Sequence, residues 1–511
     1  DKNKKLINYR NAWLKVYDKP ILYFPKFFHP DPTVKRQSGF LIPNFAGSKS
    51  LGQSITLPYF NAISENRDLT FSPRFFFDGS VIIQNEYRQV NKNSKHLIDA
   101  SMLVNSDNKG SKSHLFLNSN FDLAKNNDED SELLIKLERV SNDTYLKKYN
   151  IISPLGRDES LNSKIELSGS NENIDYFTSV EINENLNKIQ SDRYEYIFPN
   201  FSFSKNLSNN FDLLGNLEFI SNGHSKLYDT NIKENILVND LIYTSDDKIN
   251  KKGLVSNIKY LIKNFNSEAQ NSSDYKNEYD SGLMGIFSYE TKLPLINNSN
   301  NNKEIFTPKL LFNYSPNKTK NMKNSDRLID SDSIFAFNRI SAEDTVEGGE
   351  SITIGAEYRK FNSKDAEFIG FDIGSSFRIE EDHDIPISST LGQKTSDIIT
   401  KVFFNPSENF KINYNFNLDN NMDTIKYHSF KNEFKINNFI NTFEYFERSD
   451  VVLKQSYYKN AVGLELNNEN LIKFETQRNK TTDLTEYYNL IYEYKNDCLI
   501  ASIEYDKNYY T

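Results

Sequence analysis

The stretch KINYNFNL, Lys411–Leu418, alternates polar and apolar side chains without interruption. Successive side chains of an extended chain point to opposite faces, so its apolar residues share one face and its lysine and asparagines share the other. A period of two predicts a half-buried β-strand. The same period recurs in ELLIKLE (Glu132–Glu138), SITIGAEY (Ser351–Tyr358) and YYNLIYEY (Tyr487–Tyr494), whereas no segment has the period of a long helix.

The composition fits sheets that are apolar on one face only. Hydrophobic residues make up 37% of the 511 residues and the mean hydropathy is −0.66, both low for a chain with one large core. Disordered chains are also polar, but they are poor in aromatic residues, which make up 14% of this chain. The net charge of −9 provides no positive field, so we exclude nucleic acid as a partner. The sequence has no apolar run of about 18 residues, the length that a transmembrane helix needs.

Polar segments of unequal length separate the predicted strands. Long ones such as AKNNDEDSE (Ala124–Glu132) and NNSNNNKE (Asn297–Glu304) alternate with tight turns such as FDGS (Phe77–Ser80). Long loops at one end and short turns at the other are typical of outer-membrane barrels. At roughly 20 residues per strand, the sequence predicts an all-β fold, a large antiparallel transmembrane β-barrel of about 22–26 strands. An array of soluble β-sandwiches, or a β-solenoid, stays open as an alternative, although neither linkers nor a fixed period is apparent.

Prolines gather where the barrel is expected to begin. The stretch YFPKFFHPDPTVKRQSGFLIPNF (Tyr23–Phe45) contains four of them, and Pro58 follows in SITLPYF. Proline has no backbone N–H to give to a neighbouring strand. Either Pro43 and Pro58 lie at strand ends or bulges, or they weaken the pairing of the strands that carry them.

A series of motifs follows in a fixed order along the chain. It comprises KRQSGFLIPNF (Lys35–Phe45), LPYF (Leu57–Phe60), NRDLTFSP (Asn66–Pro73), NEYR (Asn85–Arg88), VSNDTYLKKY (Val140–Tyr149), FTPKLLFNYSPN (Phe306–Asn317), FAFNRISAEDTVEGGESITIGAEY (Phe335–Tyr358), TLGQKTSDIIT (Thr390–Thr400) and YKNDCLIASIEY (Tyr494–Tyr505). The series resembles the LptD family, the lipopolysaccharide-assembly proteins of the outer membrane. Asn142, Ala342 and Ile354 depart from the family's motifs.

The resemblance implies three parts. Residues 1–30 would be the tail of a periplasmic β-jelly-roll, residues 31–37 a hinge that begins beside Pro30 and contains Pro32, and residues 38–511 the outer-membrane barrel. The family's barrel has about 26 strands and its chain extends further at both ends, so we expect this chain to be truncated. The implied partners are lipopolysaccharide, an LptE-like plug lipoprotein, membrane lipids, and an LptA-like periplasmic bridge protein bound through the missing jelly-roll. The implied location is the outer membrane of a Gram-negative bacterium.

By the same resemblance, Pro43 and Pro58 match the prolines of a lateral gate between the first and last strands. Each missing hydrogen bond lowers the cost of opening this seam by roughly 1 kcal/mol. The implied function is insertion of lipopolysaccharide into the outer leaflet, its glycan crossing the lumen while its acyl chains leave sideways. A passive porin or nutrient channel and a secreted β-rich adhesin are the alternatives. The expected gate residues are Ser38, Gly39, Phe40, Leu41, Ile42, Pro43 and Pro58.

A second polar group precedes the strand predicted at Ser351–Tyr358. Arg339 has two candidate partners for a charge-assisted pair, Asp344 and Glu347. The group forms either a hydrogen-bonded turn or a polar network that positions the plug lipoprotein or the substrate. Its members are Asn338, Arg339, Ser341, Asp344, Glu347 and Gly348.

The single cysteine, Cys498, excludes an internal disulfide and a cysteine-based metal site. The resemblance implies an inter-domain disulfide between Cys498 and the missing N-terminal region, with a free buried thiol as the alternative. The acidic stretch EEDHD (Glu380–Asp384) indicates a solvated loop more than a cation site. Because no catalytic spacing of His, Asp and Ser and no phosphate-binding loop is apparent, we expect no enzyme, no cofactor and no metal.

Overall fold

The computed structural model describes residues 6–16, 19–30, 36–48, 51–104, 112–124, 129–155, 160–208, 214–299, 302–450, 452–495 and 500–508. Its contacts divide the chain into two units, each considered by itself. The first unit comprises residues 1–205, 221–237 and 267–280, and the second comprises residues 206–220, 238–266 and 281–511. Among the described residues, no helix is both long and apolar enough to cross a membrane.

The N-terminal strands form a sheet of their own. β1 (Leu6–Val16) and β2 (Lys19–Pro30) pair antiparallel, and the rings of Trp13 and Tyr23 lie 4.9 Å apart across the pair. This hairpin covers the residues that the resemblance assigns to a jelly-roll tail, an assignment that stays a prediction. Pro32 lies outside the described residues, so the hinge also stays a prediction.

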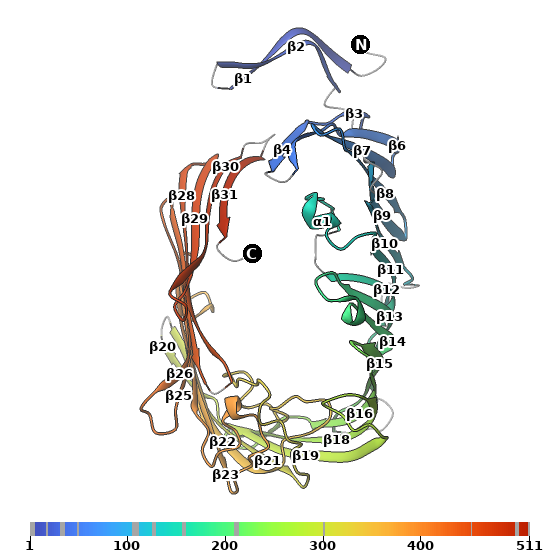
Figure 1. Ribbon diagram of the computed structural model, residues 1–511. Coiled ribbons are helices and arrows are strands. Elements are labelled where there is room, and N and C mark those ends of the chain that lie inside the picture. Colours follow the sequence, from blue (N-terminus) through green and yellow to red (C-terminus); the bar gives the residue numbers. More distant parts are fainter. Residues whose placement is uncertain are drawn as a thin grey trace. The chain divides into compact units, whose positions relative to one another are not determined.

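All other strands belong to one antiparallel sheet with barrel topology (Figure 1). Strands that follow one another in the sequence pair with one another, as β24, β25 and β26 do around the stretch Lys411–Leu418. The prediction of a large antiparallel β-barrel is therefore confirmed. The strands are β3 (Gly39–Phe40), β4 (Asn44–Ser48), β5 (Gly52–Thr56), β6 (Tyr59–Ser64), β7 (Arg67–Phe76), β8 (Val81–Asn91), β9 (Ser94–Val104), β10 (Lys112–Asp122), β11 (Asp130–Val140), β12 (Ser160–Ser170), β13 (Ile174–Asn185), β14 (Tyr194–Asn206), β15 (Gly215–Tyr228), β16 (Ile232–Ser245), β17 (Lys248–Ile249), β18 (Val255–Gln270), β19 (Asp280–Lys292), β20 (Leu295–Ser299), β21 (Asn302–Ser315), β22 (Gly349–Phe361), β23 (Glu367–Arg378), β24 (Ile398–Ser407), β25 (Phe410–Leu418), β26 (Ile425–Ile436), β27 (Phe439–Ser449), β28 (Lys454–Asn467), β29 (Asn470–Asn479), β30 (Leu484–Lys495) and β31 (Ile500–Asn508).

Four breaks split longer strands into shorter segments. β5 and β6 pair with β7 in one register, and β19 and β20 pair with β21 in one register. β3 pairs with β6 and β4 pairs with β5, with a register shift of one residue between the two segments, and β16 and β17 both pair with β18. Without these four breaks, the 29 described segments of the sheet correspond to 25 strands. Prolines stand in three of the breaks, namely Pro43, Pro58 and Pro294.

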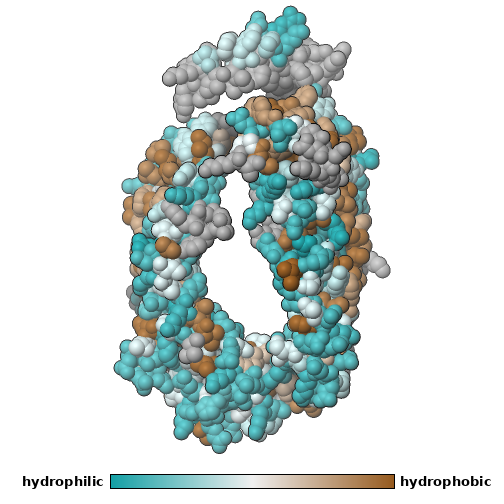
Figure 2. Space-filling model, in the orientation of Figure 1, coloured by the Kyte–Doolittle hydropathy of each residue, from teal (hydrophilic) through white to brown (hydrophobic). Residues whose placement is uncertain are grey.

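The sheet is apolar on its exposed outer face and polar on its inner face. On β22, Ile352 and Ile354 are 40% and 52% exposed, whereas the alternating Ser351 and Thr353 are 3% and 1% exposed. Figure 2 shows apolar side chains gathered on the outer side of β8 to β13, with hydrophilic ones on the side of α1 (Tyr145–Lys148). Water-soluble proteins bury apolar faces, so this reversal is typical of a wall whose outer face meets lipid.

Three connections fold back onto the inner face. In the first unit, residues 141–155, here called the α1 segment, pack on the inner face with a buried cluster that includes Leu103, Phe116 and Leu146 (Figure 1). In the second unit, residues 316–348 and 379–397 share a core and are here called the loop cap. The core of the loop cap contains Ile329, Ile334, Ile340, Ile385 and Leu391, and it packs against Ile399 of β24.

Candidate functional site

Pro43 and Pro58 interrupt the pairing of the first strands at the same height. Phe40 pairs with Tyr59 before the break, and Asn44 pairs with Thr56 after it. Within the break, the Leu41 N–H donates to the Pro58 carbonyl oxygen at 2.8 Å. Proline has no N–H to return the bond, so one hydrogen bond stands where a regular antiparallel pair has two.

Pro73 extends this break to a third strand. The Leu57 N–H donates to the Pro73 carbonyl oxygen at 3.0 Å, in the continuous register of β5, β6 and β7. Here too the return donor is missing. Pro73 was not among the predicted residues, although the sequence carries a signal: Pro43, Pro58 and Pro73 are spaced 15 residues apart. In consecutive short hairpins, the middle residues of neighbouring strands are separated in the sequence by the length of one strand plus one turn.

The remaining residues of the predicted gate lie in the same stretch. Ser38 is held in place, because its Oγ accepts the Ala62 N–H at 2.9 Å. Gly39 pairs with Phe60 at the start of the ladder. The next three side chains, Phe40, Leu41 and Ile42, are exposed. The structure therefore gathers all seven predicted residues around one interrupted pair of strands, and their role in a gate stays a prediction.

The chain is anchored just before this stretch. Asp68 is buried on β7 and forms ion pairs with Arg36 and Arg88, the latter at 2.8 Å. Arg36 also donates to the Glu65 carbonyl oxygen at 2.8 Å. Residue 36, which falls in the predicted hinge, is thus bound to the barrel wall.

The α1 segment is bonded to the strands next to the prolines. The Arg74 guanidinium donates to the Tyr149 carbonyl oxygen at 2.7 Å, and the Gln84 amide donates to the Ile152 carbonyl oxygen at 2.9 Å. A pocket of about 200 Å³ lies between this segment and the inner face of β4, β5, β7 and β8. The motif VSNDTYLKKY, picked out by the resemblance, thus forms most of a segment that covers the inner face beside the proline break.

A buried polar chain anchors the α1 segment. His114 on β10 bonds Ser101 Oγ through Nδ1 at 2.6 Å and Asp99 Oδ2 through Nε2 at 3.1 Å. Ser101 Oγ in turn lies 2.7 Å from the Tyr145 hydroxyl. Burial raises the pKa of Tyr145 to about 12, so this hydroxyl stays protonated at neutral pH. This group was not predicted from the sequence, because Ser101 and His114 meet only across the β9–β10 register.

The same four residues do not form an open active site. Asp99 and Tyr145 are fully buried, and Ser101 and His114 are nearly so. The serine hydroxyl is already bonded on two sides, to the imidazole and to the phenol. The arrangement therefore links α1 to the wall, and it offers no nucleophile to a dissolved substrate.

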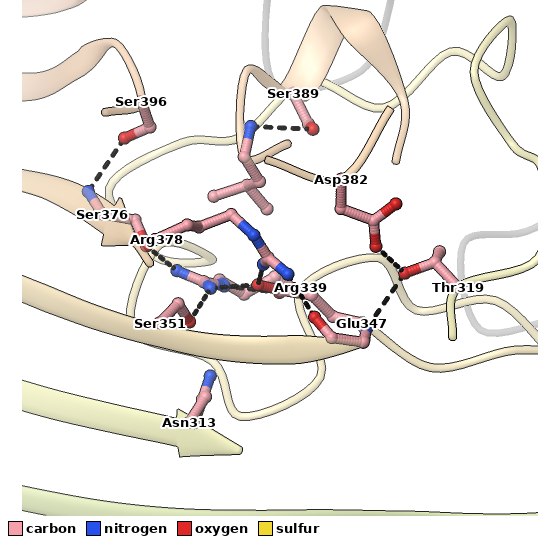
Figure 3. Close-up of polar contacts among 12 residues, drawn as sticks. Asn313, Thr319, Arg339, Glu347, Ser351, Ser376, Arg378, Asp382, Ser389 and Ser396 are labelled. Atoms are coloured by element: carbon pink, nitrogen blue, oxygen red, sulfur yellow. Dashed lines mark hydrogen bonds and ion pairs between the residues drawn. The ribbon is translucent and has the colours of Figure 1, made fainter. Parts of the chain in front are cut away.

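Arg339 fastens the loop cap to β22 and β23 (Figure 3). Its guanidinium is fully buried and forms an ion pair with Glu347, with a second contact from Nε to Oε2 at 2.8 Å. It also donates to the hydroxyls of Ser351, Thr353 and Ser376, at 2.7, 2.8 and 2.7 Å. Such charge-assisted bonds are stronger than neutral ones, and every donor group has an acceptor. Between the two candidate partners, the structure selects Glu347.

The other predicted members of the polar group lie around this pair. Arg378 binds Glu347 at 2.8 Å and also donates to the Gly348 carbonyl oxygen. Asp344 instead forms an ion pair with Lys320. Ser341 donates to the Asn338 carbonyl oxygen at 3.1 Å within a local turn. The six residues thus split into a buried network and a turn on its rim, and a role toward a partner or substrate stays a prediction.

Two further predictions concern Cys498 and the acidic stretch Glu380–Asp384. Cys498 lies outside the described residues, so its disulfide stays a prediction. Asp382, from the acidic stretch Glu380–Asp384, accepts a hydrogen bond from Thr319 at 2.5 Å within the loop cap. In the described part of the chain, no group of three or more His, Cys, Asp or Glu residues is placed to hold a metal ion.

The fold and these inner networks define a class: a membrane-type β-barrel with segments folded against its polar inner face. A family model described as LptD, LPS transport system D, matches residues 111–490, most of the chain. The chain therefore belongs to the LptD family, as the resemblance implied.

Curated relatives agree with this family over shorter stretches. LPS-assembly protein LptD of Pseudomonas aeruginosa (strain UCBPP-PA14) is 32% identical over 97 residues, which are 19% of this chain and 10% of that protein. The protein of the same description from Pseudomonas entomophila is 35% identical over 85 residues, 17% of this chain and 9% of that protein. That from Pseudoalteromonas translucida is 33% identical over 97 residues, 19% of this chain and 13% of that protein. The matched stretches thus cover about a tenth of the length of these relatives.

Proposed function

We propose that this protein inserts lipopolysaccharide into the outer leaflet of a Gram-negative outer membrane. The glycan passes along the polar inner face, and the acyl chains leave sideways at the first strands. Membership of the LptD family supports the substrate. The observation that carries the route is the interruption at Pro43, Pro58 and Pro73, where Pro58 and Pro73 each lack the N–H that would return a hydrogen bond to the neighbouring strand.

The partners belong to the same proposal. A plug lipoprotein of the LptE kind would fill the lumen, and a periplasmic bridge protein of the LptA kind would deliver substrate to a jelly-roll that the β1–β2 hairpin completes. The sheet's apolar outer face supports contact with membrane lipids. Neither partner requires chemistry from this chain, which we propose to be a transporter and not an enzyme.

Replacing Pro43 and Pro58 by alanine tests the route. Each alanine supplies an N–H, and each restored bond contributes roughly 1 kcal/mol, or about 2 kcal/mol for both. A gate that is harder to open by this amount opens about 30-fold less often. We expect surface delivery of newly made lipopolysaccharide, measured by pulse labelling and surface modification in cells, to slow by at least tenfold.

Pro294→Ala is the matched control, because this proline interrupts the strand formed by β19 and β20 in the second unit. The neighbouring Leu293 N–H donates to the Pro308 carbonyl oxygen at 3.1 Å, just as the Leu57 N–H donates to the Pro73 carbonyl oxygen. We expect this control variant to deliver lipopolysaccharide to the surface at the normal rate. If the Pro43 and Pro58 variant also delivers at the normal rate, the gate proposal is wrong.

A further inference from the structure

A pocket of about 570 Å³ lies in the second unit between the loop cap and the inner face of β25 and β26. The cap contributes Gln393 and Asp397, and the strands contribute Asn417, Lys426 and Tyr427. This volume falls within the range of about 300–1,000 Å³ that is usual for ligand pockets. None of these five residues belongs to the Arg339 network or to the predicted gate.

The walls of this pocket are held rigidly. The Asn417 amide donates to the Ile329 carbonyl oxygen at 3.0 Å, and the Arg327 N–H donates to Ser388 Oγ at 2.9 Å. Arg448 pairs with Asp326 of the cap and keeps the pKa of that carboxyl below its ordinary value. Together with Arg339, these contacts fix the cap against the strands, so the pocket exists before any ligand enters.

The charges that line the pocket cancel. Asp397 is buried and pairs with Lys426 at 2.8 Å. Burial raises the pKa of the Asp397 carboxyl above its ordinary value, and the bond from Lys426 offsets part of this rise. The other charged lining groups, Asp450 and Lys454, are again one of each sign. A phosphate site needs an excess of cationic donors, so this balance favours a neutral ligand.

Several polar groups in the pocket are available to a ligand. Within the described ranges, the Gln393 amide and the Tyr427 hydroxyl make no hydrogen bond. The amide offers two donors and an acceptor, and the phenol offers one of each. The Tyr427 ring, set edge-on against Phe446 at 5.8 Å, adds a flat apolar surface. Flat rings beside mixed donors and acceptors suit a ligand with apolar C–H faces and many hydroxyl groups.

We propose that this pocket binds a neutral saccharide unit, namely a sugar of the lipopolysaccharide glycan on its way along the inner face. The substrate part of this proposal rests on the proposed function. The pocket would hold the glycan while the acyl chains move through the gate at the other end of the sequence.

The test places a photo-reactive phenylalanine analogue at Gln393 of the full chain in living cells. Lipopolysaccharide is the probe, and immunoblotting detects the adduct. The same analogue at Met422, which is 67% exposed in the β25–β26 turn outside the pocket, is the matched control. We expect an adduct at Gln393 at least fivefold stronger than at Met422, and at least a fivefold loss of the Gln393 adduct when Tyr427→Ala is added.

A reference position separates the pocket from the transport route. The analogue at Leu41 reports substrate at the gate. An adduct at Leu41 with none at Gln393 overturns the pocket and leaves the proposed function standing, whereas no adduct at either position contradicts both. Mass spectrometry of the digested adduct must find the link on a sugar. A link on an acyl chain, or an adduct that Tyr427→Ala leaves unchanged, also overturns the saccharide proposal.

Discussion

Replacing Arg339 by methionine should detach the loop cap from the barrel wall. The change leaves Glu347 with Arg378 as its remaining cationic partner and removes the donor from Ser351 and two further buried hydroxyls. Removing one partner of a buried ion pair costs about 3–5 kcal/mol. Methionine fills much of the volume of arginine, so the loss is chiefly one of charge and hydrogen bonds.

Limited chymotrypsin digestion of the purified protein in detergent measures this effect. Phe335 and Phe337 lie in the cap and are protected while it stays attached. If the cleavage rate is proportional to the population of the opened cap, a loss of about 3 kcal/mol in the stability of the attached cap raises the cleavage rate on the order of 100-fold. Lys320→Met is the matched control, because its pair with Asp344 is partly exposed and contributes at most about 1 kcal/mol. Equal cleavage of the two variants would show that Arg339 does not hold the cap.

His114→Ala should release the α1 segment from β9 and β10. The substitution leaves the buried Asp99 carboxylate with the Gln84 amide alone, at 3.0 Å, and opens a cavity beside Tyr145. A buried acceptor that loses its donor costs about 1–3 kcal/mol, and the cavity left by the imidazole adds to this cost. We therefore expect the amide hydrogens of residues 145–151 to exchange on the order of 100-fold faster, as measured by hydrogen–deuterium exchange and mass spectrometry.

His96→Ala is the control on the neighbouring strand. His96 also bonds two serines, Ser119 and Ser94, both at 3.0 Å, but it is only half-buried, and its hydrogen bonds and ring contact go to residues of the strands and their turn and not to the α1 segment. Exchange in residues 145–151 should stay at the level of the unchanged protein. A similar rise in both histidine variants would mean that the polar chain through Asp99 does not anchor this segment.

The contacts of Arg339 and of His114 both bear on the proposed transport. The α1 segment covers the inner face beside Pro43, Pro58 and Pro73, and Arg74 joins it to β7. The loop cap forms one wall of the proposed saccharide pocket. Both inner segments are thus attached by fully buried polar groups, and weakening either one changes a surface along the proposed path of the glycan.

Local patterns were sufficient to predict the strands. The stretch Lys411–Leu418 lies entirely in β25, and Ser351–Tyr358 lies in β22, because alternation of side chains depends only on neighbouring residues. The breaks at Pro43 and Pro58 were visible for a similar reason, since proline lacks its donor in any fold. Pro73 was missed because its place in the row depends on the register of three strands.

Charge pairing was beyond the reach of the sequence. Asp344 and Glu347 both lie within a few residues of Arg339, and only the course of the loop cap brings Glu347 to it while Lys320 takes Asp344. The Asp99–His114–Ser101 chain likewise needs the β9–β10 register and the return of the α1 segment. Long-range contacts of this kind depend on how loops of many residues close, which no local period encodes.

By itself, the sequence predicted a large antiparallel barrel, prolines that either end or weaken its first strands, and motifs that resemble those of the LptD family. Only the tertiary structure decided which face the α1 segment and the loop cap cover, which carboxylate binds Arg339, and where a pocket opens. The physical reason is the distance along the sequence over which each kind of interaction acts. Side-chain alternation and a missing donor act within a few residues, whereas networks and pockets arise where distant segments meet.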